Sequence, residues 1–293
     1  MKTIKLFIIA AAGVLALSAC SRENTLEESK TITVQASIGA ISKVTTTETT
    51  ASFDSGDKIT VFAWTGDKTA VPANRVVDGI SNTCYVSVWL PDQPMLWADM
   101  VTPHYFLGIY PVRTVTDFKA DAFTIKPDDY QASDLLVATN TQGLKATDAA
   151  VDLVFDHVAA KLFVNLTFRN QWDPAPTVSS VTVTAKKSGT VDYLAKTITA
   201  TANEAAAPIE LTKAKNEAWS GLQIPQNVRS ITITIDGKNY VFTHTEDIPL
   251  EGGKFTTVNL IVGRDKIELG NVSISDWKEG TTINGGEATN DED

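Results

Sequence analysis

Hydrophobic and polar residues alternate along much of the chain, most clearly between Val151 and Phe168. The apolar positions fall into two runs, Val151, Leu153, Phe155 and then Leu162, Val164, Leu166, Phe168. A period of two is typical of strands that bury one face. The alternation loses phase across Asp156–Lys161, which predicts that the chain bends or changes sheet there.

Shorter alternating runs predict further strands, separated by turns that contain Gly, Pro, Asn and Asp. They are expected at Ile59–Trp64, Tyr85–Trp89, His104–Tyr110, Ala122–Ile125, Leu135–Thr139, Val178–Ala185, Leu194–Thr199, Ile209–Thr212, Trp219–Ile224, Phe255–Val262 and Val272–Trp277. Ile231–Phe242 predicts a β-hairpin, because Asp236 and Gly237 stand between two alternating runs and both residue types tolerate positive φ.

The cleanest strand of the N-terminal half is Thr31–Ile38, which alternates strictly. One face of this strand carries Ile32, Val34, Ala36 and Ile38. Similar lengths of strand-and-turn sequence lie on either side of the Val151 block, and a sandwich domain holds about 100 to 150 residues. The sequence therefore predicts an all-β fold of two antiparallel β-sandwich domains in tandem, of transthyretin-like or Greek-key type, at 31–148 and 149–277.

The two ends of the chain differ from these domains. Residues 1–19 have a positive start at Lys2 and Lys5, an apolar core too short for a bilayer, which takes about 20 residues, and a small-residue cleavage site before Cys20. This predicts a lipoprotein signal with lipidation of Cys20; the alternative is an ordinary secretory peptide followed by a coincidental cysteine. Residues 20–30 are expected to form a polar, acidic, lipidated tether, and residues 278–293 a disordered acidic tail.

Charge and cysteine content narrow the class of protein. The formal net charge is −10, and it becomes −12 if Lys2 and Lys5 leave with the signal. Such an acidic balance argues against nucleic acid as a partner, because binding phosphates requires Lys and Arg. Once Cys20 is lipidated, Cys84 has no cysteine partner in the chain, so no disulfide framework is expected.

The sequence carries no recognisable catalytic or cofactor motif. Its three histidines, His104, His157 and His244, each stand alone in β-type sequence without neighbours at metal-ligand spacing. Nucleophile elbow, phosphate-binding glycine loop, zincin motif and calcium-loop consensus are all missing from the sequence. We therefore expect no enzyme activity, no cofactor and no metal, with an enzyme built on a carboxylate pair as the weaker alternative.

The most aromatic loop surrounds Pro91 and Pro94 and includes Trp89 and Trp97. Exposed indole rings can stack on sugars, so these two residues are candidate surface aromatics for a glycan or host-surface ligand. The alternative is that they cap a hydrophobic core, which is commoner for such residues.

An ordered set of motifs runs through the chain. The most specific is Val-x-Leu-x-Phe-x-His-x-x-Ala-Lys-Leu-x-Val-x-Leu, which begins at Val151. The others are the lipoprotein signal ending at Cys20, Phe53–Phe62, Tyr110–Pro111, Ser133–Ala138, Val258–Arg264 and Ile274–Trp277. Together they resemble the fimbrillin-like family, the type V pilins and associated lipoproteins of Gram-negative gut and oral anaerobes.

This resemblance implies a structural subunit of a cell-surface pilus, anchored in the outer membrane by the lipid on Cys20. In the family a trypsin-like protease removes the first strand at a basic residue; many members carry Arg there, and this chain carries Lys43. Loss of the strand would expose unpaired backbone groups and an apolar groove. A strand from another pilin subunit would fill it by donor-strand exchange. The alternative is that the first strand stays in its own sheet.

The segment that this chain would donate must itself carry alternating apolar residues, which residues 278–293 lack. The candidate donor strand therefore lies before the tail and carries Ile267, Leu269, Val272 and Ile274. If that strand is needed in its own domain, the chain would accept without donating, as a non-polymerising tip or anchor subunit. The rival function from another class is a surface glycan-binding lipoprotein.

Overall fold

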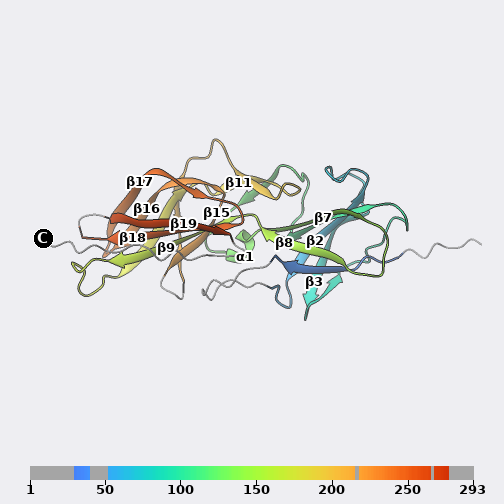
Figure 1. The fold of residues 1–293 in the computed structure, drawn as a ribbon, viewed down its shortest axis with the longest axis horizontal. Coiled ribbons are helices and arrows are strands. Elements are labelled where there is room, and N and C mark those ends of the chain that lie inside the picture. Colours follow the sequence, from blue (N-terminus) through green and yellow to red (C-terminus); the bar gives the residue numbers. More distant parts are fainter. Residues whose placement is uncertain (1–29, 40–51, 215–217, 265–266, 277–293) are drawn as a thin grey trace, which may run out of the picture.

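The computed structural model describes residues 30–39, 52–214, 218–264 and 267–276. Strands make up nearly all of the secondary structure in this part of the chain, together with one short helix, α1 (Tyr130–Ser133). The predicted all-β fold is confirmed (Figure 1). Cys20, Lys43 and the tail 278–293 lie outside the described residues.

The largest sheet has seven strands, in the order β1-β8-β7-β5-β2-β3-β4. Their bounds are β1 (Val34–Ile38), β2 (Lys58–Thr65), β3 (Val77–Tyr85), β4 (Val88–Pro91), β5 (His104–Tyr110), β7 (Leu136–Leu144) and β8 (Val151–His157). Val34 and Trp89 come from the two edge strands but share one hydrophobic cluster. The sheet therefore curves around its own core.

Three further sheets complete the molecule. A three-stranded sheet, in the order β12-β11-β6, contains β6 (Asp121–Thr124), β11 (Ser188–Asp192) and β12 (Thr197–Ala200). A four-stranded sheet, β13-β10-β16-β17, contains β10 (Val178–Ala185), β13 (Ala207–Glu210), β16 (Gln226–Ile235) and β17 (Lys238–Leu250). A five-stranded sheet, β14-β15-β9-β18-β19, contains β9 (Ala160–Phe168), β14 (Thr212–Lys213), β15 (Trp219–Gln223), β18 (Lys254–Val262) and β19 (Ile267–Asp276).

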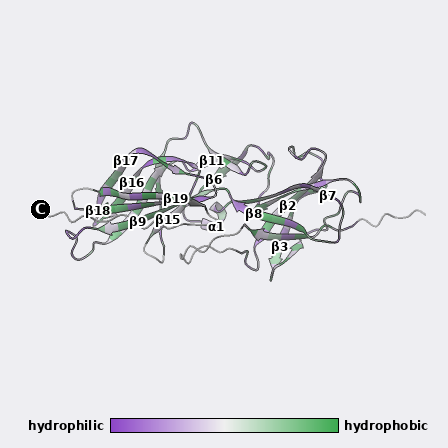
Figure 2. Cartoon of the chain, viewed as in Figure 1, coloured by the Kyte–Doolittle hydropathy of each residue, from purple (hydrophilic) through white to green (hydrophobic). Residues whose placement is uncertain are grey.

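The four- and five-stranded sheets pack face to face, because a single apolar cluster draws side chains from both. Figure 2 shows apolar and polar residues alternating along β16, β17 and β18, as expected for strands with one buried face. The seven-stranded sheet is different, because its central strands are buried on both faces. In β2, Val61 faces the inner core and Phe62 faces a second core shared with the three-stranded sheet.

The chain changes sheet between β8 and β9, at Val158–Ala159, as the loss of phase predicts. The exchange comes later than the expected domain boundary at 148/149, because β8 pairs with β7 and β1 of the first sheet. β11 also joins β6, a strand from the first half of the chain. Hydrogen bonding therefore connects the two halves more extensively than two separate sandwiches would.

One local expectation differs from the structure and another is confirmed. The single strand expected at Tyr85–Trp89 is interrupted by a turn at Val86 and Ser87, both of which have positive φ (49° and 73°). Sequence did not indicate this turn, because a β-branched residue rarely adopts that conformation. The hairpin at Asp236–Gly237 is confirmed, with φ values of 48° and 76° and Ile235 paired with Lys238.

Candidate functional site

The first strand lies at the edge of the seven-stranded sheet, where β1 pairs with β8 alone among the strands of that sheet. The pairing is parallel, with Val34 opposite Val151 and Ile38 opposite Phe155. At the two ends, the Val151 amide donates to Thr33 O at 2.8 Å and the Gly39 amide donates to Phe155 O at 2.8 Å. An antiparallel first strand was expected, so its parallel direction is a correction to the sequence analysis.

The chain just before β1 is also held on its other side, by the loop that follows β4. The Ile32 amide donates to Met95 O at 2.7 Å, and the Trp97 amide donates to Lys30 O at 3.0 Å. Thr31 and Leu96 form an isolated antiparallel bridge. The first strand thus lies in a slot, with β8 along one side and the 95–97 segment across its start.

The side chains of this strand alternate as the sequence predicts. Ile32 and Val34 are buried, with 2% and 5% of their surface exposed, and Ala36 and Ile38 pack against the same core while partly exposed. The residues between them, such as Thr33 and Gln35, face solvent. Burying an aliphatic side chain stabilises a fold by about 1.5 to 3 kcal/mol, so the inner face holds the strand firmly.

The floor under the strand comes from Leu153 and Phe155 on β8, which lie over Gly108 of β5. A Cβ at position 108 would lie 2.6 Å from the Phe155 ring and 3.2 Å from Leu153. Real Cβ atoms do not approach other atoms so closely, so a glycine is required here by packing rather than by backbone conformation.

An aromatic cluster closes the end of the slot near Ile38. The Phe53 ring packs edge-on against Trp89, Tyr110 and Phe155, with centroid distances of 5.1, 5.4 and 5.3 Å. The Tyr110 hydroxyl donates to Asp57 Oδ1 at 3.2 Å, and burial raises the pKa of Tyr110 to about 12. The Phe53–Phe62 and Tyr110–Pro111 motifs therefore meet at this end of the slot.

The candidate surface aromatics are not on the surface, which corrects that expectation. Trp89 and Trp97 are only 5% and 4% exposed and belong to the inner core. The Trp97 ring packs edge-on against His104 and Phe106, at 4.9 and 5.5 Å. Neither indole can stack on a sugar, because other side chains already cover both of them.

The candidate donor strand, β19, is also an edge strand, at the edge of the five-stranded sheet. It pairs antiparallel with β18 and has no strand on its other side among the described residues. Ile267, Leu269 and Val272 are partly buried against the core between the four- and five-stranded sheets, whereas Ile274 is exposed. An ion pair between Glu268 and Arg169, the residue that follows β9, adds a further link.

The histidines take structural positions. His157 Nδ1 lies 2.7 Å from Asp134 Oδ1. His104 bonds through its two ring nitrogens to the Ala98 amide and the Thr102 carbonyl. His244 Nδ1 lies 3.0 Å from its neighbour Glu246 O.

The described residues also bear on metal binding and membrane spanning. Across the ranges with described coordinates, no group of three or more His, Cys, Asp or Glu side chains could hold a metal ion. Within the same ranges, no helix has the length and apolar character needed to span a bilayer.

The sequence matches a family described as fimbrillin-like, over residues 16–277. Two candidate cell adhesion proteins of known structure, from Bacteroides uniformis and Bacteroides ovatus, are each 16% identical with a TM-score of 0.66. Their alignments cover 84% and 86% of this chain and 98% and 99% of theirs. A fimbrial protein from Bacteroides vulgatus is 15% identical, with a TM-score of 0.54 and coverage of 85% and 99%. No protein with a curated description matches.

Proposed function

We propose, from the premise that this chain belongs to the fimbrillin-like family, that it is a structural subunit of a cell-surface fimbria and accepts a strand from a neighbouring subunit. The observation that carries this proposal is the position of β1, an edge strand whose alternating apolar side chains enter a core built by other strands. Such a strand can be replaced by any extended segment with the same alternation.

Removal of the strand would leave a defined acceptor. The amide of Val151 and the carbonyls of Met95 and Phe155 would lose their backbone partners, and the floor of Leu153 and Phe155 would be exposed. An edge with unpaired backbone groups above an apolar surface is unstable in water, because both are better satisfied by a new strand. The energy that drives assembly would come from covering this slot.

The parallel direction of β1 adds a constraint on the donor. A replacement that follows the native register runs parallel to β8, with apolar side chains opposite Val151, Leu153 and Phe155. A donor that runs antiparallel to β8 would use a different hydrogen-bond pattern. The segment around Met95 would still be free to pair with the start of the incoming strand, as it does with residues 30–32.

Lipid anchoring and proteolytic removal of the first strand belong to the same proposal. Cys20 carries the lipid that anchors the chain in the outer membrane before assembly, with several acyl chains giving firm attachment. Lys43 is the site at which a trypsin-like protease releases the first strand. It falls between the end of β1 and Phe53, so a cut there separates β1 from the rest of the sheet without breaking any of the strands that the structure describes.

Proteolysis tests this proposal directly. The purified protein is treated with a trypsin-like protease, the new N-terminus is read by mass spectrometry, and size is followed by light scattering. We expect a cut after Lys43, release of the segment with Ile32 and Val34, and growth into oligomers. The Lys43→Gln variant should stay intact and monomeric, whereas Lys68→Gln, a change at an exposed lysine elsewhere, should assemble.

A synthetic peptide with the sequence of residues 31–38 provides the second arm. Added after cleavage, it should occupy the slot and stop assembly, whereas a peptide of the same composition in scrambled order should not. Failure of the cleaved protein to bind this peptide would refute strand acceptance, whereas persistent monomers that still bind it would identify an acceptor that does not donate.

Whether the chain also donates a strand depends on β19. We infer that it does, because β19 is an edge strand and three of its apolar residues are only partly buried in their own domain. A disulfide between Thr257→Cys and Ser273→Cys, which stand directly opposite each other on β18 and β19, would lock the strand in place. After cleavage, the locked protein alone should stay monomeric, because it can accept a strand but cannot donate one; unhindered polymerisation of the locked form would instead assign donation to another segment.

A further inference from the structure

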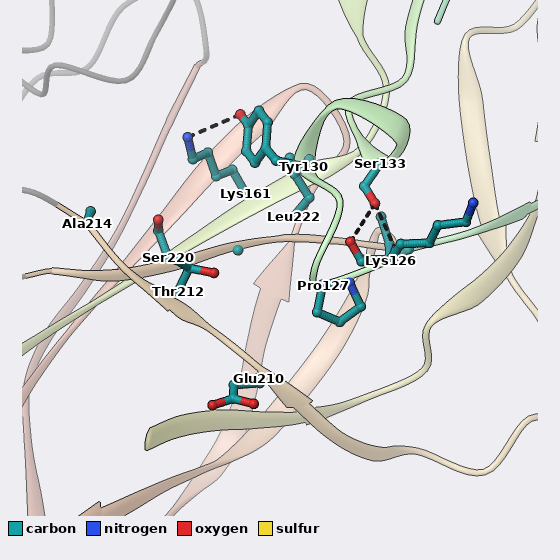
Figure 3. Close-up of a pocket in the computed structure, with 12 residues that line it drawn as sticks. Lys126, Pro127, Tyr130, Ser133, Lys161, Glu210, Thr212, Ala214, Ser220 and Leu222 are labelled. Atoms are coloured by element: carbon teal, nitrogen blue, oxygen red, sulfur yellow. Dashed lines mark hydrogen bonds between the residues drawn. The ribbon is translucent and has the colours of Figure 1, made fainter. Parts of the chain in front are cut away.

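A second site lies apart from the slot of the first strand. Helix α1 and the loop before it stand over the β15 side of the five-stranded sheet and enclose a cavity of about 430 Å³ (Figure 3). This volume is within the usual range of small-molecule sites. Neither the fimbrial function nor the first strand requires an open cavity at this place.

The floor of the cavity is formed by β15 and β9. Leu222 pairs with Lys161 in the antiparallel register, and Ser220 pairs with Phe163. Ser220 is buried, yet its hydroxyl makes no hydrogen bond within the described part of the chain and lines the cavity. A hydroxyl that faces an open space is suited to bonding a ligand, because its donor and acceptor positions are not used within the protein.

The roof is Tyr130, whose side chain is held in place from below. Lys161 is 1% exposed, and its ammonium donates to Tyr130 Oη at 3.2 Å and lies 4.9 Å from the centroid of the Tyr130 ring. The same ammonium lies 5.1 Å from the centroid of the Phe163 ring. Lys161 is thus a positioning residue that fixes the tyrosine, while 45% of the Tyr130 surface stays exposed.

The loop and helix that carry Tyr130 are themselves anchored. Asp129 caps α1, since its carboxylate accepts from the Ala132 amide at 3.0 Å. Ser133 Oγ accepts from the Lys126 amide at 2.8 Å and donates to the Lys126 carbonyl at 3.0 Å. The roof is therefore organised before any ligand arrives, which lowers the entropy lost on binding.

The rim mixes apolar and polar groups. Ile125 and Pro127 add apolar surface, and Glu210 and Thr212 place a carboxylate and a hydroxyl on the other side. Figure 3 shows Pro127, Glu210 and Thr212 around the cavity. Charges of both signs border the cavity, so neither an anion nor a cation is favoured overall. An aromatic ring, apolar patches and several separate hydrogen-bonding groups match a neutral ligand with one apolar face and many hydroxyls.

We propose that this cavity binds a neutral pyranose residue of a glycan. The Tyr130 ring and Leu222 would cover the apolar C–H face of the sugar, while Ser220, Thr212 and Glu210 would bond its hydroxyls. The proposal is independent of strand exchange, because it uses none of the residues of the slot.

An array of neutral and charged oligosaccharides, probed with the purified full-length protein, tests this assignment, followed by calorimetric titration with the monosaccharide from the best neutral hit. We expect Tyr130→Ala and Ser220→Ala each to weaken binding by about tenfold, the loss typical of one ring contact or one hydrogen bond. Tyr85→Ala removes another exposed tyrosine, far from the cavity in sequence, and should leave binding unchanged.

Three results would overturn the proposal: no binding to any neutral saccharide, binding to charged saccharides only, or equal binding by Ser220→Ala and the parent protein. Circular dichroism of each variant shows whether it is folded. Ser220→Ala removes one oxygen atom only, so it tests glycan binding in the cavity even if Tyr130→Ala fails to fold.

Discussion

A single substitution, Ile32→Ala, measures how much the buried side chains of the first strand stabilise it in the slot. Ile32 is among the largest fully buried side chains, and it lies at the start of the strand between β8 and the segment around Met95. Alanine keeps the backbone hydrogen bond from the Ile32 amide to Met95 and removes three carbons. At about 0.8 kcal/mol per buried carbon group, the transfer term is about 2 kcal/mol. A residual cavity raises the expected loss in unfolding free energy to about 2 to 5 kcal/mol.

Urea unfolding measures the total loss, and amide hydrogen exchange locates it. The Val151 amide, which donates to Thr33, and the Gly39 amide, which donates to Phe155, report on pairing between the first strand and β8. We expect both amides to lose protection in Ile32→Ala, and to lose more than the amides that join β16 to β17. The strand should then open locally before the rest of the molecule unfolds.

The neighbouring change Thr33→Val is the matched control. Thr33 faces solvent, and valine has nearly the same shape, so unfolding free energy should change by no more than about 0.5 kcal/mol. If Ile32→Ala and Thr33→Val had equal effects, or if protection of the Val151 amide stayed the same in Ile32→Ala, apolar burial could not be what retains the first strand.

Three other outcomes are expected. Gly108→Ala should destabilise the protein by about 1 to 3 kcal/mol in urea unfolding, because its Cβ would overlap Phe155, and adding Phe155→Leu should recover part of that loss; an additive double variant would contradict this. Hydrogen bonds from the Thr102 hydroxyl and the amides of Thr102 and Val101 lower the pKa of Asp99 to about 2. The Asp99 carboxylate therefore stabilises the fold fully above its ordinary pKa of 3.8, and this stabilisation is lost as the pH falls toward 2. NMR titration of Thr102→Val should give a higher pKa for Asp99, and an unchanged pKa would show that the Thr102 hydroxyl does not lower it. Val86→Asn should raise the unfolding free energy by about 1 kcal/mol, and with it the melting temperature, because Asn tolerates positive φ. A lower melting temperature would show that Val86 makes compensating contacts.

Much of the candidate site was open to prediction because strand periodicity is a local property. Alternation fixes which side chains of a strand share a face, and the structure buries Ile32 and Val34 while exposing Thr33, as the alternation requires. The loss of phase after Phe155 likewise marks the point where the chain leaves one sheet for another. These features depend only on neighbours in the sequence.

Pairing partners could not be predicted in the same way. Nothing in the sequence shows that β1 runs parallel to β8, more than a hundred residues later, or that the segment around Met95 bonds the chain before β1. Alternating strands can pair with any other strand of suitable face. Which pairing occurs depends on how whole sheets pack, so the slot emerges only in the folded molecule.

The amino-acid sequence by itself determined that this protein is built of strands, which side chains turn inward, and where a two-residue hairpin forms at Asp236–Gly237. Only the tertiary structure decided that Trp89 and Trp97 are enclosed, that β8 belongs to the first sheet, and that Lys161 supports Tyr130 over a cavity. The physical reason is that side-chain direction follows from local backbone geometry. Exposure instead depends on the other elements that come to lie against each face.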